Sequence, residues 1–231
     1  MAIVGLIAAF IVTAIVLTLW INHRKLKREA YIRAYSLPRG LFEKLRLKHP
    51  NLSIKDCELV ARGLRKFFLA YLRGSRKPVA MPSQVVDDLW HEFILYTRNY
   101  EVFNQQAFGR FLHHTPAAVM SKDRSNNEAL RRTWWHSCLE ENINPKAPNR
   151  LPLLFALDAK LNIEGGFRYA TDCSALAKQG FVPNGSAVHC GGDFSSPSFD
   201  GSTDGLGDSS SGSGGDSGGD GGGCGGGCGG D

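Results

Sequence analysis

Four histidines and one aspartate in the middle of the chain have side chains that could hold a metal ion. Asp87 and His91 are four residues apart, so on a helix both side chains leave the same face. His113 and His114 are adjacent near the expected end of another helix, and His136 follows a tryptophan pair. A carboxylate and two or three imidazoles around an open position suit zinc or non-haem iron. One hypothesis is therefore a metal site built from Asp87, His91 and His113, with His114 and His136 as further candidate ligands.

The same residues also fit a buried polar cluster that binds no metal. In that interpretation the imidazoles cap helix ends, bond to backbone carbonyls and stack on Trp90 and Trp135, while Asp87 holds His91 in one tautomer. The sequence contains no H-E-x-x-H zinc-protease motif, no phosphate-binding loop, no dinucleotide fingerprint and no G-x-S-x-G. With no recognisable catalytic motif, the sequence favours a protein that is not an enzyme.

A second group of candidate ligands lies near the C-terminus. Cys224 and Cys228 are separated by three glycines, a spacing found in zinc half-sites, and His189-Cys190 could supply the other half. A spacer of glycine alone costs much entropy to order, so an unstructured pair of tail thiols is the simpler interpretation. S-acylation of these thiols beside a membrane is a third alternative. Cys57, in an apolar helical pattern, is expected to be a buried thiol.

Helices must position the candidate ligands, because apolar residues recur at three- and four-residue steps and no alternating strand pattern of any length appears. The clearest helix opens at Ser53, a capping residue, and ends at Gly74. Ser83 is expected to cap the helix that carries Asp87 and His91 and that runs to about residue 99. Further helices are expected over residues 23–36, 38–48, a short run ending near 109, 126–141 and 152–161. A small hairpin is the only β-structure envisaged, within residues 163–190.

The N-terminal segment has the composition of a membrane anchor. Residues 2–21 include no charged side chain, and as a helix they would span ~30 Å, the thickness of the hydrocarbon core of a bilayer. Trp20 suits the headgroup region, and a dense basic flank follows at residues 24–28. A cleaved signal peptide would carry its charges before the apolar stretch and a small-residue cleavage site after it. The pattern therefore predicts one transmembrane helix, and the positive-inside rule places the N-terminus outside and the domain in the cytoplasm.

Charge and glycine are distributed unevenly along the chain. Residues 22–48 carry nine lysines and arginines against two glutamates, whereas residues 179–231 carry seven aspartates and no basic residue. The basic end is explained by anionic lipid headgroups without invoking nucleic acid. The last 31 residues include sixteen glycines and cannot bury enough apolar surface to order themselves. We expect a mainly α protein with a transmembrane anchor (1–22), a basic juxtamembrane helix (23–36), a small helical-bundle domain (37–192) and a disordered acidic Gly/Ser/Cys tail (193–231).

A motif follows in the segment between residues 86 and 116. It reads V-D-x-x-W-H-x-x-I-L-x-T and then F-G-x-F-x-H-H-x-P, with structural positions at Trp90, Thr97, Tyr100, Gly109 and Pro116. This pattern resembles the glycine-rich domain-containing protein family of plants and bacterial membrane proteins, over roughly residues 40–170. The Gly/Cys-rich C-terminus is similar to the tails of bacterial members, and Asn104 stands where a cysteine is expected. The resemblance implies a helical fold and a bacterial inner-membrane location, and it brings no established reaction.

Together these features predict a membrane-anchored interaction or scaffold protein that faces the cytoplasm. Its expected partners are the lipid bilayer and another protein, and no nucleic acid is expected. The alternative is a metal-dependent enzyme or sensor that uses the histidine and aspartate cluster with zinc or iron.

Overall fold

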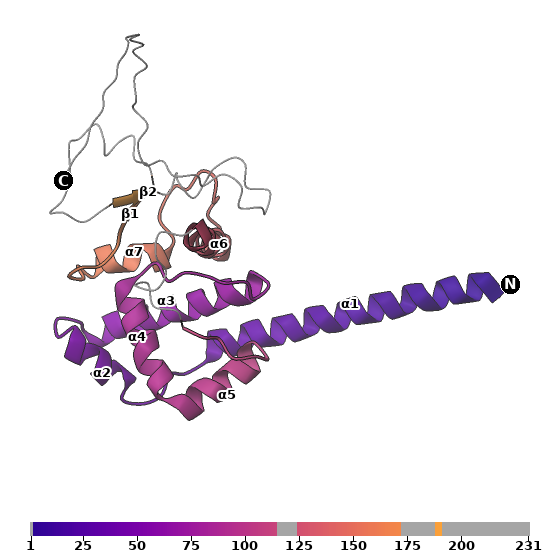
Figure 1. Ribbon diagram of the computed structural model, residues 1–231, viewed down its shortest axis with the longest axis horizontal. Coiled ribbons are helices and arrows are strands. Elements are labelled where there is room, and N and C mark those ends of the chain that lie inside the picture. Colours follow the sequence, from indigo (N-terminus) through magenta and orange to yellow (C-terminus); the bar gives the residue numbers. More distant parts are fainter. Residues whose placement is uncertain (1, 115–123, 172–187, 191–231) are drawn as a thin grey trace, which may run out of the picture.

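The computed structural model describes residues 2–114, 124–171 and 188–190, and its elements are arranged as Figure 1 shows. The helices in these ranges are α1 (Ala2–Ala34), α2 (Leu41–Lys48), α3 (Ile54–Arg73), α4 (Gln84–Leu95), α5 (Thr97–Ala107), α6 (Arg124–Glu140) and α7 (Leu153–Lys160). The strands are β1 (Arg168–Ala170) and β2 (Val188–Cys190). The mainly helical class predicted from the sequence is confirmed, with an apolar helix at the N-terminus.

Helix α1 runs without a break from the apolar segment into the basic one. Its first half projects away from the other helices (Figure 1), and the large apolar side chains between residues 3 and 21 are exposed. Its last turns are packed into the domain, where Ile32 is fully buried. Among the described residues, 3–34 form one helix that is long and apolar enough to cross a membrane, a property that signal sequences share.

Helix α3 is the centre of the domain. Ser53 and Asp56 form a capping box at its start, and Gly74 ends it, so both boundaries predicted from the sequence are confirmed. The helix contacts α6 and α7 as well as α4, α2 and α1. Gly63 permits the closest approach, because a Cβ there would lie 2.5 Å from Leu157 Cδ1 and 3.1 Å from Val86 Cγ2.

Two predicted helix boundaries are wrong. The helix expected to run from Ser83 to about residue 99 ends at Leu95, and a new helix starts at Thr97. The break falls at Tyr96, whose hydroxyl donates to the Arg39 carbonyl at 3.3 Å, and it redirects the chain so that Tyr100 is buried. Helix α2 begins three residues after Pro38, at Leu41, because Gly40 adopts a left-handed φ of 87°.

The small β-element is not the hairpin envisaged from the sequence. β1 and β2 pair in parallel, with Tyr169 opposite His189. A hairpin would be antiparallel, and a parallel pair needs a longer connection between its strands. The expected tail, 193–231, lies outside the described residues.

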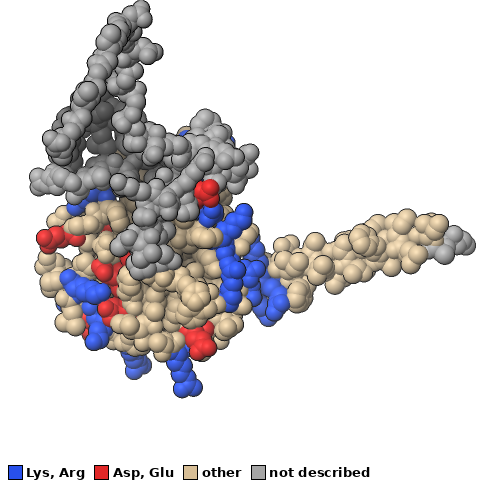
Figure 2. All heavy atoms as spheres, in the orientation of Figure 1, with Lys and Arg blue, Asp and Glu red and all other residues tan. Residues whose placement is uncertain are grey.

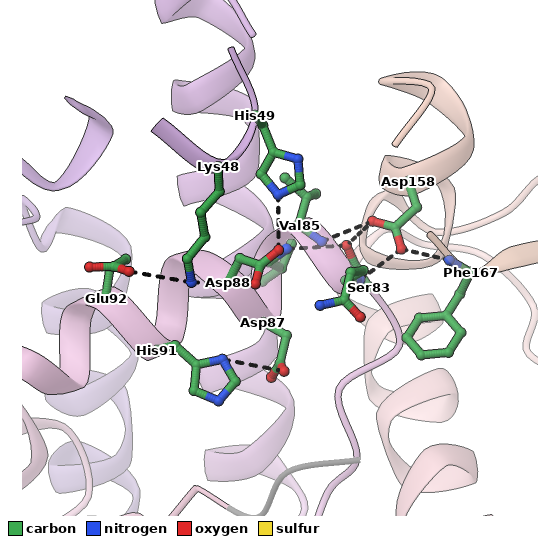
Figure 3. A network of polar contacts seen from close by, with 12 residues as sticks. Lys48, His49, Ser83, Val85, Asp87, Asp88, His91, Glu92, Asp158 and Phe167 are labelled. Atoms are coloured by element: carbon green, nitrogen blue, oxygen red, sulfur yellow. Dashed lines mark hydrogen bonds and ion pairs between the residues drawn. The ribbon is translucent and has the colours of Figure 1, made fainter. Parts of the chain in front are cut away.

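Asp158 of α7 fixes the start of α4. Its buried carboxylate accepts hydrogen bonds from Ser83 Oγ at 2.7 Å and from the backbone N–H groups of Gln84 and Val85 at 2.7 and 3.2 Å (Figure 3). It also accepts from the Phe167 N–H at 2.9 Å. One carboxylate therefore satisfies the first two free N–H groups of α4 and lies at the positive end of that helix.

Replacing this carboxylate should destabilise the whole domain. Asp158→Ala leaves four donors, two buried and two partly buried, without their acceptor, and we expect the free energy of unfolding to fall by about 3 kcal/mol or more. Chemical denaturation of the detergent-solubilised full chain measures this change. Asp158→Asn, which retains one acceptor oxygen, should lose less, and exposed Glu164→Ala should match the wild type. An Asp158→Ala chain as stable as Glu164→Ala would contradict the assigned role.

Candidate functional site

Helix α4 presents two of the candidate ligands on one face. Asp87 lies in its first turn and His91 one turn later, and their closest side-chain atoms, Oδ2 and Nδ1, are 3.5 Å apart. Ser83 caps the helix by accepting from the Val86 N–H, and Leu89 and Phe93 bury the opposite face in the core. The i, i+4 spacing read from the sequence thus produces the expected pairing.

The third candidate ligand, His114, lies in the segment after α5. Its Nε2 lies 2.8 Å from Asp87 Oδ1, and its ring meets the edge of Trp90 with centroids 4.4 Å apart. The rings of His114 and His91 lie against each other at 4.1 Å between centroids. One ligand atom from each of Asp87, His91 and His114 lies within 4.8 Å of the other two.

A buried hydrogen-bond network holds the segment that carries His114. Trp90 Nε1 donates to the Tyr100 hydroxyl at 3.1 Å, and that hydroxyl donates to the Leu112 carbonyl at 2.6 Å. Burial raises the pKa of Tyr100 to about 12, so the phenol remains a donor at neutral pH. Asn104 closes the network, because its side chain donates to the Tyr100 carbonyl at 2.7 Å and accepts from the Leu112 N–H at 3.0 Å.

Among the three residues of the cluster, the side chain of His91 is the most exposed. The side chain of His114 is 8% exposed and that of Asp87 15%, whereas His91 is 40% exposed. The neighbouring acidic residues of α4 turn toward α2 instead (Figure 3). Lys48 Nζ lies 3.6 Å from Asp88 and 3.3 Å from Glu92, and His49 Nε2 lies 2.9 Å from Asp88, so both carboxylates are paired outside the cluster.

His113 and His136 do not join this group. His113 is exposed and its ring packs against Phe111 at 4.9 Å, because consecutive residues of an extended segment point in opposite directions. His136 lies on α6 beside Gly74 at the end of α3. Burial and then the positive charges of Arg73, Lys25 and Arg132 lower the pKa of His136 to about 4. A ring surrounded by cations is poorly placed to share a metal ion with Asp87.

The remaining residues singled out in the sequence have structural positions or lie outside the described ranges. Trp90 and Tyr100 are buried, Thr97 is the exposed first residue of α5, and Gly109 adopts a left-handed φ of 69°. Cys57 is buried, as predicted. Cys224, Cys228 and Pro116 are outside the described residues, and Cys190 is described only as part of the backbone of β2.

Sequence reasoning missed two residues that position the site. Asp158 is 71 residues from Asp87 and carries no local motif that ties it to α4. Asn104 stood out as a departure from the motif, yet its amide does what a thiol would do poorly, since it donates and accepts at the same time.

A family model matches residues 27–194, which is most of the chain. The chain belongs to the UCP032817-like family. The match starts after the apolar part of α1 and includes the cluster of Asp87, His91 and His114, so this site belongs to the family domain. No curated protein and no solved structure matches the chain.

Two imidazoles and one carboxylate are a known ligand set for zinc and for non-haem iron, and they leave positions open for water or a substrate. In this cluster, the open coordination positions of a bound metal would lie next to His91, whose side chain is the most exposed of the three. His114 Nε2 is within hydrogen-bond distance of Asp87, so a metal ion would displace the proton that the two share.

The metal-site hypothesis for this cluster predicts that the protein binds a divalent metal ion. In a Cys224→Ser, Cys228→Ser chain, which removes the tail thiols as competitors, we expect about one zinc per chain by elemental analysis. His91→Ala and His114→Ala should each abolish that binding, while His113→Ala, which changes the adjacent exposed ring, should retain it. A zinc content below about 0.1 per chain in the Cys224→Ser, Cys228→Ser protein would instead identify a purely structural cluster.

Proposed function

We propose that the protein is a single-pass membrane protein whose first helix anchors the UCP032817-like domain at the cytoplasmic face of a bacterial inner membrane, where the domain binds a protein partner. The observation that carries the proposal is the surface of α1. Its apolar half is uncovered over its whole length, with Phe10 76% and Leu6 72% exposed. A bilayer is the environment that satisfies such a surface, and residues 2–21 have the length to cross it.

The second half of α1 supports the same proposal because it is fixed to the domain. Arg73 of α3 binds Glu29 at 2.8 Å and Glu140 at 2.5 Å, and Arg33 binds the same Glu140 with Nη2 at 2.8 Å. The Tyr35 ring lies 4.6 Å from Phe103 and 5.8 Å from Phe93. An anchor joined in this way would hold the domain at a set distance from the bilayer, which suits a surface-bound interaction module.

The orientation follows from the charges at the end of the apolar stretch. Arg24, Lys25, Lys27 and Arg28 come directly after it, and basic residues beside a transmembrane helix remain on the cytoplasmic side. The acidic residues 193–231 would then also lie on the cytoplasmic side. The resemblance of residues 86–116 to the glycine-rich domain-containing family stays part of the proposal, since it agrees with a membrane-bound helical domain.

A groove next to the α1–α2 connection is where we place the protein partner. It has a volume of about 770 Å³ and lies between residues 33–43 and the first half of α3. Leu37, Phe42 and Ile54 are the large apolar side chains that line it. Four arginines and two glutamates supply its charge: Arg33, Arg39, Arg62, Arg65, Glu43 and Glu58. The excess of positive charge fits an acidic segment with one or two apolar side chains.

Reporter fusions after Asp231 test the anchor and its orientation. We expect the full chain to sediment with membranes and to resist carbonate extraction. A green fluorescent protein fusion should fluoresce, and an alkaline phosphatase fusion should be inactive, because the C-terminus faces the cytoplasm. Leu6→Lys with Ile11→Lys should release the chain from the membrane, whereas two lysines at exposed positions of the domain, Leu47→Lys and Leu95→Lys, should not. Recovery of a soluble wild-type chain that starts after Trp20 would refute the anchor.

Photo-crosslinking in cells tests the groove. A benzoylphenylalanine in place of Ile54, which lines the groove, should yield a specific adduct, and one in place of Leu95 should not. Arg62→Glu should reduce the adduct about tenfold, because it reverses a charge that attracts an acidic segment. Arg98→Glu, at an exposed position of α5, is the matched control and should leave the adduct yield unchanged. Equal adducts from positions 54 and 95, or no effect of Arg62→Glu, would exclude this docking site.

A metal-dependent enzyme or sensor is the second candidate function. It is favoured by one observation, the convergence of Asp87, His91 and His114 with an exposed side at His91. The zinc measurement described for these residues separates it from an interaction module that uses the cluster only for stability.

A further inference from the structure

A cavity of about 330 Å³ lies where α1 leaves its apolar stretch and meets the end of α3. One wall comes from α1 and the other from the turn after α3, more than 40 residues away in sequence. Its lining comprises Trp20, Ile21, Arg24, Lys25, Arg28, Leu72, Arg73, Ser75 and Arg76. Five of these residues are basic and none is acidic. Figure 2 shows Lys and Arg side chains gathered around the base of the projecting helix.

Most of these cations are not neutralised by the described part of the protein. Arg73 is paired with Glu29 and Glu140, but within residues 2–114, 124–171 and 188–190 no carboxylate lies within ion-pair distance of Arg24, Lys25, Arg28 or Arg76. Burial, and next the like charges of Arg76 and Arg24, lower the pKa of Arg28. The fold thus brings positive charges together at a cost that a bound anion would offset.

The turn that brings Arg76 to the cavity is built with unfavourable backbone angles. Ser75 and Arg76 both have a φ of 58°, a left-handed conformation that residues with a side chain rarely adopt. Arg76 is held there by three hydrogen bonds. Its Nη1 donates to the Phe108 carbonyl at 3.0 Å, its backbone N–H donates to the Tyr71 carbonyl at 3.0 Å, and its own carbonyl accepts from Arg110. Strain of this kind is concentrated at ligand-binding segments and is retained when the surroundings enforce it.

The position of the cavity along α1 identifies the ligand. Trp20 and Ile21 are the last residues of the apolar stretch, and the guanidinium of Arg24 lies 4.4 Å above the Trp20 ring. In the proposed anchor this is the depth of the lipid headgroups on the cytoplasmic side. Guanidinium groups match the oxygens of a phosphate, and a phospholipid phosphate is the anion present at that depth.

We propose that this cavity is a binding site for the phosphate of an anionic phospholipid in the cytoplasmic leaflet, held between Arg24, Arg28 and Arg76. This inference rests on the proposed anchor. It adds a built site formed jointly by α1 and the turn after α3, as distinct from a general attraction between a basic flank and the membrane surface.

Lipid retention by the full chain tests the site. The protein is purified in a non-ionic detergent and incubated with equal amounts of phosphatidylglycerol and phosphatidylcholine, and bound lipid is counted by native mass spectrometry. We expect phosphatidylglycerol to be retained in preference to phosphatidylcholine. Arg28→Gln with Arg76→Gln should reduce that preference about tenfold, because each basic residue near the headgroups contributes severalfold. Arg24→Gln with Lys25→Gln should act in the same direction; both side chains are exposed, and neither makes a side-chain hydrogen bond to another described residue.

The control variant removes two positive charges from residues that do not line the cavity. Arg98→Gln with Lys160→Gln, on exposed positions of α5 and α7, should leave the preference unchanged. An equal loss in this control would reduce the site to a diffuse electrostatic effect and overturn the proposal, as would no loss in either cavity pair. Competition by millimolar glycerol 3-phosphate or inorganic phosphate would identify a free phosphate as the ligand and overturn the lipid assignment. A wild-type chain found in the soluble fraction would refute the anchor instead, so the two failures are distinct.

Discussion

The uncharged stretch at the start of α1 has no apolar partner among the described residues, and this constraint governs the interpretation of the whole molecule. Thirteen large apolar side chains between Ile3 and Ile21 are at least half exposed. Leaving them in water costs on the order of 20 kcal/mol, more than a domain of this size gains in net stability. In the proposed anchor this cost is removed, because the stretch lies in the apolar interior of a bilayer and the rest of the chain is a domain held at the end of that helix.

The way this helix joins the domain explains why the charges at the junction are fixed. Arg73 and Arg33 share Glu140, and Arg73 also binds Glu29, so α1, α3 and α6 meet in one ion-pair network. Networks of this type are worth more than isolated surface pairs because each side chain is already held by its neighbours. Arg28 and Arg76 flank this network in sequence, have no carboxylate partner within the described ranges, and line the same cavity. A flexible linker after the apolar stretch would have let them separate.

Local chemistry made much of the fold predictable. Ser53, Gly74 and Ser83 act at helix ends through groups within four residues, so their roles could be read from the sequence. The break at Tyr96 could not, because no glycine or proline marks it and the reason is tertiary: the turn buries Tyr100 and Phe103 against Phe93. The start of α4 is completed by Asp158, a contact between residues far apart in the chain.

The candidate site shows the same division between local and long-range information. The pair of Asp87 and His91 follows from helical spacing, whereas the choice between His113 and His114 depends on how the segment after α5 is held. Tyr100 and Asn104 hold it by hydrogen bonds to the Leu112 carbonyl and N–H, two residues before His114. Trp90 supports the Tyr100 hydroxyl from one side and the ring of His114 from the other. Because these groups are buried and hydrogen-bonded, His114 is held against Asp87 in the absence of a ligand. The conformational free-energy cost of arranging the two side chains around an ion would therefore be small.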